Sequence, residues 1–149
     1  MRDECYQAKL WLNRNFDSLK KLKADMDMLA VLENLLGSGV ARYENDGTSS
    51  GDSDAARHKH EDMLLEYSER RADVESEKMK LAADLLKTRR AIDSLENDEF
   101  KTVAIERYIC CKKWDDIAKA MHICRAQAFR VHDKMIEKMV AILKEGGEI

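Results

Sequence analysis

The chain has 149 residues, of which 37% are charged and 6% are aromatic, and it contains no proline. This composition suits long helices and disfavours a β-sheet, so we expect an all-α fold. The length allows one modest domain, or a small domain with an extended helical arm, and a net charge of −3 excludes a strongly basic nucleic-acid binder.

The sequence carries no signal for a membrane or for secretion. No apolar run approaches the roughly 20 residues that a membrane-crossing helix needs. The first seven residues, MRDECYQ, lack the charged-then-apolar layout of a signal peptide. Four cysteines, at positions 5, 110, 111 and 124, show no C-x-x-C spacing. We therefore expect a reduced, cytosolic protein without a membrane partner.

The first predicted helix covers residues 3–36. Its apolar residues recur at spacings of three and four, which places them on one stripe of an α-helix. The stripe consists of Leu12, Phe16, Leu19, Leu22, Met26, Leu29, Leu32 and Leu36. Gly37 then stands where a C-cap glycine would, and the glycine- and serine-rich residues 37–54 predict a flexible loop.

A second periodic run predicts a helix over residues 55–96. Its stripe consists of Leu64, Tyr67, Val74, Leu81, Leu85, Ile92 and Leu95, and Arg71, Lys78 and Thr88 interrupt it. About 40 residues of helix span roughly 60 Å and must lie against a partner. That partner is either the first helix, folded back antiparallel, or a second copy of the chain. Residues 1–97 are thus expected to form a coiled-coil-like helical hairpin arm, which could set a homodimer.

A third helix is expected over residues 98–111. Asn97, Asp98 and Glu99 supply the capping side chains and the negative charge that a helix N-terminus favours. Its apolar face consists of Phe100, Val103, Ala104, Tyr108 and Ile109.

Two further apolar-periodic stretches, residues 114–121 and 125–144, are separated by His122, Ile123 and Cys124. A short helix, a tight turn and a second helix make a helix-turn-helix, which places side chains in a DNA major groove. The expected buried positions are Ile117, Ala118, Met121, Ile123, Ala128, Val131, Met135 and Met139. His122 occupies a turn position that wants a left-handed backbone, and Cys124 replaces the usual Ser or Thr cap.

The outward face at the start of the second motif helix consists of Arg125, Ala126, Gln127, Phe129 and Arg130. Arginine can donate two hydrogen bonds to guanine, glutamine can pair with adenine, and Ala126 or Phe129 could touch a thymine methyl group. The residues expected nearer phosphates are Lys112, Lys113, Lys119, Lys134 and His132. Residues 119–144 hold six basic and two acidic residues, so any DNA affinity should be moderate and salt-dependent. The alternative interpretation is a solvated helix face.

The run from Phe100 to Leu143 resembles region four of bacterial sigma factors, and more closely the ArpU/RinA-like late transcription activators encoded by phages. The matching residues are Arg107, Tyr108, Ile109, Trp114, Ile117, Ala118, Val131 and His132. Those phage proteins also tend to carry a long helical segment before the module. The resemblance implies that residues 98–149 are a sequence-specific binding domain for double-stranded DNA, acting in phage or prophage transcription inside a bacterial host, with RNA polymerase as a further partner. Cys124 and Ala126 depart from the pattern.

Other functions remain alternatives at this stage. Helix-turn-helix domains also open small terminase subunits, and a coiled-coil adaptor would need no DNA. We expect no enzyme, because no Gly-rich phosphate loop, nucleophile–base pattern or paired carboxylates are present. We expect no cofactor and no metal. The candidate ligands Cys110, Cys111, His122 and Cys124 straddle a helix end and a turn rather than forming a zinc knuckle.

Overall fold

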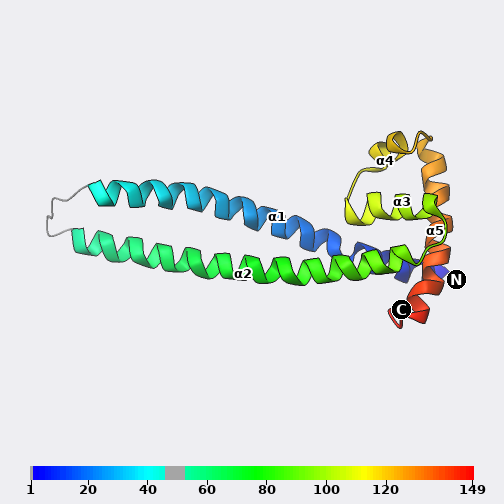
Figure 1. The fold of residues 1–149 in the computed structure, drawn as a ribbon, viewed down its shortest axis with the longest axis horizontal. Coiled ribbons are helices and arrows are strands. Elements are labelled where there is room, and N and C mark those ends of the chain that lie inside the picture. Colours follow the sequence, from blue (N-terminus) through cyan, green and yellow to red (C-terminus); the bar gives the residue numbers. More distant parts are fainter. Residues whose placement is uncertain (1, 46–52) are drawn as a thin grey trace. The chain divides into compact units, whose positions relative to one another are not determined.

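The computed structural model describes the backbone of residues 2–45 and 53–149, and the side chains of residues 2–37 and 54–149. Every regular element in these ranges is helical, which confirms the all-α prediction (Figure 1). In chain order the elements are α1 (Arg2–Asn45), α2 (Ser53–Asp93), α3 (Asp98–Ala104), the π-helical turn η1 (Ile105–Ile109), α4 (Trp114–Ala120) and α5 (Arg125–Glu145). None of the helices in the described ranges is both long and apolar enough to cross a membrane.

The chain packs as two compact units, which do not follow the order of the sequence. Unit 1 consists of Met1–Leu19 together with Leu81–Ile149, and unit 2 consists of Lys20–Lys80. The helices α1 and α2 each contribute to both units. Unit 1 therefore draws residues from both of the ranges, 1–97 and 98–149, that the sequence separates into an arm and a module.

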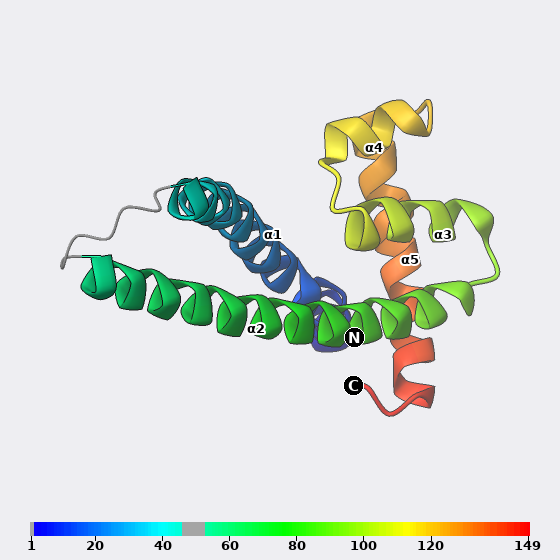
Figure 2. The ribbon, with the colours of Figure 1, turned by 60° about the vertical axis from the view of Figure 1, so that its left-hand side comes forward.

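Unit 2 is formed by the adjoining parts of α1 and α2, which run in opposite directions (Figures 1 and 2). The side chains of Leu22 and Val74 are buried in it, and Lys21 Nζ lies 3.8 Å from Glu77 Oε1 across the two helices. Its exposed large apolar side chains are Met26, Met28, Val31, Leu35, Met63, Leu65 and Met79. Met26 belongs to the predicted inward stripe, so the stripe is only partly covered here.

The helix α1 does not end at Gly37, where the sequence predicts a C-cap glycine, but continues to Asn45. Gly37 does not adopt a positive φ, and a Cβ placed on it would meet no heavy atom within 4 Å. A single glycine costs a helix about 1 kcal/mol relative to alanine, which is not enough to stop a long helix. The predicted loop over residues 37–54 is therefore too long at its start. Residues 46–52 lie outside the described residues.

Unit 1 has a continuous hydrophobic core to which α1, α2, α3, η1 and α5 contribute. Its buried members are Ala8, Leu12, Ile92, Leu95, Ala104, Tyr108, Met135, Ile136, Met139, Val140 and Leu143. One polar pair is buried in the same unit: Asn15 Nδ2 donates to Thr88 Oγ1 over 3.3 Å. Thr88, which interrupts the predicted stripe of the second helix, is thus an interior contact between α1 and α2.

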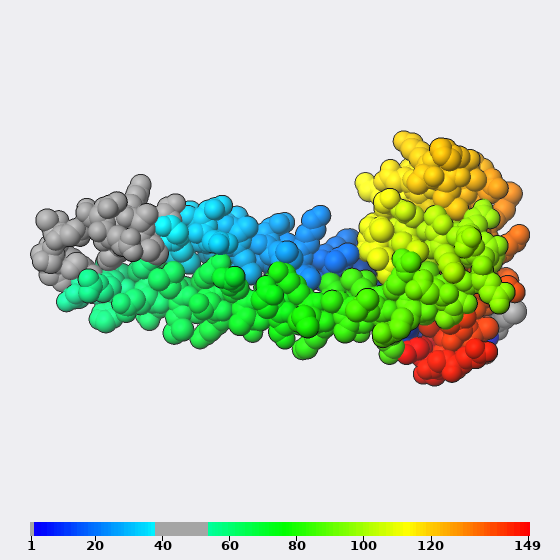
Figure 3. Space-filling model, in the orientation of Figure 1, coloured from blue at the N-terminus to red at the C-terminus, as the bar shows by residue number. Residues whose placement is uncertain are grey.

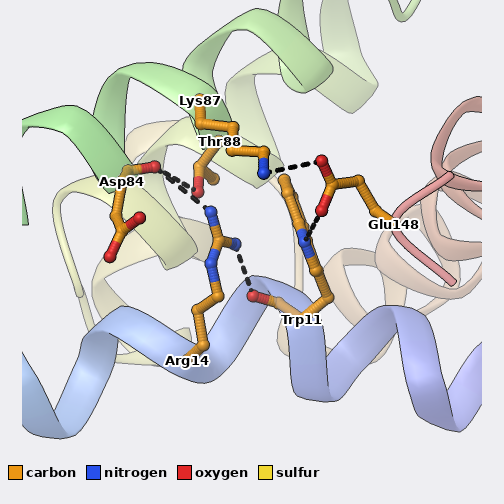
Figure 4. Close-up of polar contacts among 6 residues, drawn as sticks. All are labelled: Trp11, Arg14, Asp84, Lys87, Thr88 and Glu148. Atoms are coloured by element: carbon orange, nitrogen blue, oxygen red, sulfur yellow. Dashed lines mark hydrogen bonds and ion pairs between the residues drawn. The ribbon is translucent and has the colours of Figure 1, made fainter. Parts of the chain in front are cut away.

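Polar contacts hold the C-terminal residues of unit 1 against the start of α1 and the end of α2 (Figure 4). The indole Nε1 of Trp11 donates to Glu148 Oε2 over 3.2 Å, and Lys87 Nζ lies 2.7 Å from Glu148 Oε1. The hydrogen bonds from Lys87 and Trp11 lower the pKa of Glu148, although burial opposes them. Arg14 lies over the Trp11 ring at 3.8 Å and donates to the carbonyl oxygens of Trp11 and Asp84.

The connection from the long helices to the helix-turn-helix begins with a capped helix. The Asn97 side chain accepts hydrogen bonds from the backbone N–H groups of Glu99 and Phe100, at 2.8 and 3.3 Å, so the predicted cap is confirmed. After Ala104 the helix widens into η1, where the Cys110 N–H donates to the Ile105 carbonyl over 2.9 Å. The predicted helix over residues 98–111 is therefore two pieces, and π-helical turns of this kind reorient the side chains that follow.

Candidate nucleic-acid interface

The predicted helix-turn-helix is present, with α4, a turn and α5 at nearly the expected bounds. Both α3 and α4 pack against α5 (Figures 1 and 2). In the turn, His122 has φ 56°, which confirms the expected left-handed backbone. The Ile123 N–H donates to the Ala118 carbonyl over 3.0 Å and closes the end of α4. Figure 3 shows α4 and the start of α5, in yellow to orange, at the surface at one end of unit 1.

Neither motif helix has a side-chain cap, as the sequence predicts for Cys124. Lys113 precedes α4 and Cys124 precedes α5, both with extended backbones and neither with a side-chain hydrogen bond to the helix. Ordinary Ser or Asp caps contribute about 1 kcal/mol each. The motif must therefore be held by packing, and Ile117, Ala118 and Ala128 are indeed buried between the helices.

The outward face of α5 is accessible as expected. Ala128 and Val131 are buried, whereas the face itself, consisting of Arg125, Ala126, Gln127, Phe129 and Arg130, is exposed. For the side chains of Gln127 and Arg130, no hydrogen-bond or ion-pair partner is present in the described part of the chain. These two side chains are free to meet a ligand.

Arg125 differs from Gln127 and Arg130 because it lies close to two other side chains. Its Nη1 lies 3.6 Å from Asp115 Oδ1 at the start of α4, and its guanidinium lies 5.5 Å from the Phe129 ring centroid. Both partners of the ion pair are largely exposed, so the pair contributes little to stability.

The four predicted phosphate-contacting lysines, Lys112, Lys113, Lys119 and Lys134, are exposed. Within the described residues, Lys112 alone of these four has an ion-pair partner: its Nζ lies 2.5 Å from Glu106 Oε2, and the hydrogen bond to Glu106 raises the pKa of the Lys112 ammonium. Asp115, Asp116 and Asp133 are also exposed near these residues in the sequence and reduce the positive charge of the surface. The charge balance remains as modest as the composition indicates.

His132 is not at the surface, so the prediction that it lies near phosphates is wrong. Its side chain is buried, and Tyr108 Oη lies 2.5 Å from its Nε2. Burial raises the pKa of Tyr108 to about 12 and lowers the pKa of His132 to about 4. A neutral imidazole therefore accepts from the Tyr108 hydroxyl near neutral pH. The sequence does contain a signal for the burial of His132. This residue lies four positions from both Ala128 and Ile136, which places all three on one helix face.

Aromatic side chains connect the two motif helices. The Trp114 ring lies 4.7 Å from Phe129 and 4.9 Å, edge-on, from His132, measured between centroids. The guanidinium of Arg107 lies 5.1 Å from the Trp114 ring and 5.6 Å from the Phe16 ring. No local sequence pattern connects Phe16 with this site, because its partner Arg107 is 91 positions further along the chain.

In the described part of the chain, the four cysteines do not form a recognisable metal centre. Cys110 and Cys124 are exposed, Cys5 and Cys111 are half-buried, and within the described ranges no three His, Cys, Asp or Glu side chains are grouped so that they could share a metal ion. Cys111 has φ 55° at the end of the π-helical turn.

Comparisons with protein-family models, with curated proteins and with solved structures found no match to this chain.

Proposed function

We propose that this protein binds double-stranded DNA and regulates transcription, with the N-terminal half of α5 in the major groove. One observation carries the proposal. Packing fixes α5 through Ala128 and Val131, while Arg125, Gln127 and Arg130 lie exposed within its first two turns. A fixed helix that presents side chains able to pair with base edges is the arrangement that direct readout needs.

The chemistry of these side chains fits base recognition. Arg125 and Arg130 can each make two hydrogen bonds to guanine, and Gln127 can pair with adenine. Lys112, Lys113, Lys119 and Lys134 would contact phosphates and set the register of the helix on the duplex without reading sequence. The buried His132 has no part in this contact.

The resemblance to sigma-factor region four and to ArpU/RinA-like activators favours a regulator of phage or prophage late genes in the cytoplasm of a bacterial host. The modest charge of the surface favours help from a second DNA-bound copy or from RNA polymerase. We assign the protein no enzymatic activity. The long helices α1 and α2 would supply the contact to the second copy or to polymerase.

The test is selection of DNA from a random pool by the full-length chain at two salt concentrations. We expect enrichment of one sequence, with affinity that falls steeply as salt rises because phosphate contacts release counterions. Retention of DNA without enrichment would contradict sequence-specific regulation. Absence of retention at low salt would contradict DNA binding and favour an adaptor.

The molar mass in solution separates the proposal from a packaging role. A monomer or dimer fits a transcription regulator, whereas a large closed ring would favour a small terminase subunit. Light scattering after size-exclusion chromatography, with and without the selected DNA, gives the measurement.

A further inference from the structure

Five side chains of unit 1 form a single series in which aromatic rings and guanidinium groups are neighbours. The series runs from Phe16 on α1 through Arg107 on η1 and Trp114 at the start of α4 to Phe129 and Arg125 on α5. Successive separations are 5.6, 5.1, 4.7 and 5.5 Å, measured to or between ring centroids. The last two members belong to the exposed face of α5.

Arg107 is the second member of this series and is held by a hydrogen bond to the backbone. Its Nη1 donates to the Lys112 carbonyl over 2.9 Å, and its guanidinium lies near two aromatic rings, those of Phe16 and Trp114. A planar guanidinium can stack on rings and keep its hydrogen bonds in plane, which a lysine ammonium cannot do. The contact thus depends on arginine rather than on positive charge alone.

The series lies outside the hydrophobic core of unit 1. Phe16, Arg107, Trp114 and Phe129 belong neither to the buried cluster nor to the apolar side chains packed against it. Phe129 is 37% exposed, and the Arg125 side chain is 61% exposed. Contacts that end on exposed side chains add little to folding, but they limit the orientations of those side chains before a ligand arrives. Such preorganisation improves binding because less side-chain freedom is lost.

We propose that Arg107 is a positioning residue of the DNA-reading face. Through Trp114 it fixes Phe129 and, with Phe129, the direction of Arg125. Phe16 extends this control to α1, so a residue outside residues 98–149 contributes to the choice of base. The inference rests on the proposed function. It adds the residues that orient Arg125, and none of these residues needs to touch DNA.

The test compares Arg107→Gln and Arg107→Lys with a matched control, Arg14→Gln. Arg14 also lies over an aromatic ring and donates to backbone carbonyls in unit 1, but it is not a member of the series. The readout is the ratio of affinities for the selected DNA site and for its single-base variants. Thermal unfolding is measured alongside, because a purely structural role would lower stability without changing this ratio.

We expect both Arg107 variants to lower the ratio by roughly tenfold at the base that Arg125 reads, the scale set by loss of one well-formed arginine–base contact. Arg14→Gln should leave the ratio unchanged. If Arg107 instead contacted a phosphate, lysine would restore binding and base preference would not change, and the inference would be overturned. An equal loss of discrimination in Arg14→Gln would overturn it as well.

Phe16→Leu tests the far end of the series, with Phe100→Leu as its control, since Phe100 is a half-buried aromatic residue of the same unit and outside the series. Phe16→Leu should lower the ratio in the same direction as Arg107→Gln, and combining the two should add little, because both break one chain of contacts. Fully additive losses would overturn the coupling. A wild-type chain that discriminates no DNA sequence would overturn the proposed function itself, whereas a discriminating wild type with unchanged variants overturns this inference alone.

Discussion

Units 1 and 2 contain parts of the same two long helices, yet they are stabilised in different ways. In unit 2, Leu22 and Val74 are the only buried side chains among the residues whose burial is described, and several large apolar side chains remain exposed. In unit 1, α1 and α2 meet additional helices, and a continuous core results. A periodic apolar stripe therefore predicts a helix and its inner face, but not how much of that face is covered.

Within unit 1, one set of residues stabilises the fold and another set is exposed for recognition. The core of unit 1 determines where α5 lies, and the exposed face of α5 is available because Ala128 and Val131 are buried beneath it. Changes in unit 2 should leave this face alone. The following predictions test that separation.

The largest expected effect is on folding, from truncating one leucine of α1 in each unit. Leu12 in unit 1 is 1% exposed and Leu22 in unit 2 is 8% exposed. Leu12→Ala should lower the free energy of unfolding by about 2–5 kcal/mol, since it opens a cavity that several helices surround. Leu22→Ala should cost less than half as much, because water and neighbouring side chains can fill its site. Urea unfolding followed by circular dichroism measures both, and equal losses would remove the contrast between the units.

The next effect is on DNA, from replacing one basic residue in each unit. Arg130→Ala should cost about 1–3 kcal/mol of affinity for the selected site and relax the base preference at one position. Lys78→Ala, in unit 2, removes an ammonium paired with Glu75 at 3.0 Å and should leave specific binding intact. Fluorescence-anisotropy titrations of both variants give the comparison. The opposite result would mean that recognition belongs to unit 2.

A third effect is a loss of stability at acidic pH. The folded pKa of His132 is about 4, below its ordinary value of 6.5, so the unfolded chain binds a proton first. The free energy of unfolding should therefore be highest above pH 6.5 and fall as the pH approaches 4, with a loss of about 1 kcal/mol from His132 at pH 5.5. Asp133, Lys9 and Arg107 act on the same imidazole, but burial dominates. His132→Gln, which can still accept from Tyr108, should flatten this part of the profile. A wild-type profile that is already flat from pH 7 to 5 would contradict the burial of His132.

The smallest effect concerns the ion pair at the reading face. Asp115→Asn removes the carboxylate that Arg125 approaches to 3.6 Å. Exposed ion pairs are worth about 0.2–1 kcal/mol, so DNA affinity should rise by no more than about fivefold. Glu75→Gln in unit 2 breaks a comparable exposed pair and should have no effect on DNA binding. A fall in affinity on Asp115→Asn would mean that Asp115 orients Arg125 productively.

Local features of the sequence predicted much of this structure. The all-α class, the Asn97 cap, the left-handed His122 and the bounds of the two motif helices all follow from signals within a few residues. The end of α1 was not predictable from Gly37, since one glycine weakens a helix without ending it. The prediction for His132 was wrong because a spacing of three or four residues from Ala128 fits Val131 and His132 equally, and both are buried.

Contacts between distant parts of the chain lay beyond the reach of sequence patterns. Nothing in residues 1–19 indicates that Leu12 packs in one core with Met139 and Leu143, or that Phe16 approaches Arg107. The apolar period of α1 is equally compatible with a partner helix from α2, from α5 or from another chain. Only the three-dimensional arrangement distinguishes them.

The contact between Trp11 and Glu148 also has a consequence for synthesis on the ribosome. The two residues are separated by 137 positions. At ordinary rates of translation, of about 5–20 residues per second, the start of α1 is made on the order of ten seconds before its C-terminal partner. During that interval Ala8 and Leu12 cannot yet reach the α5 residues that share their core. The apolar stripe at the start of α1 thus stays incompletely covered in the nascent chain until α5 has been made.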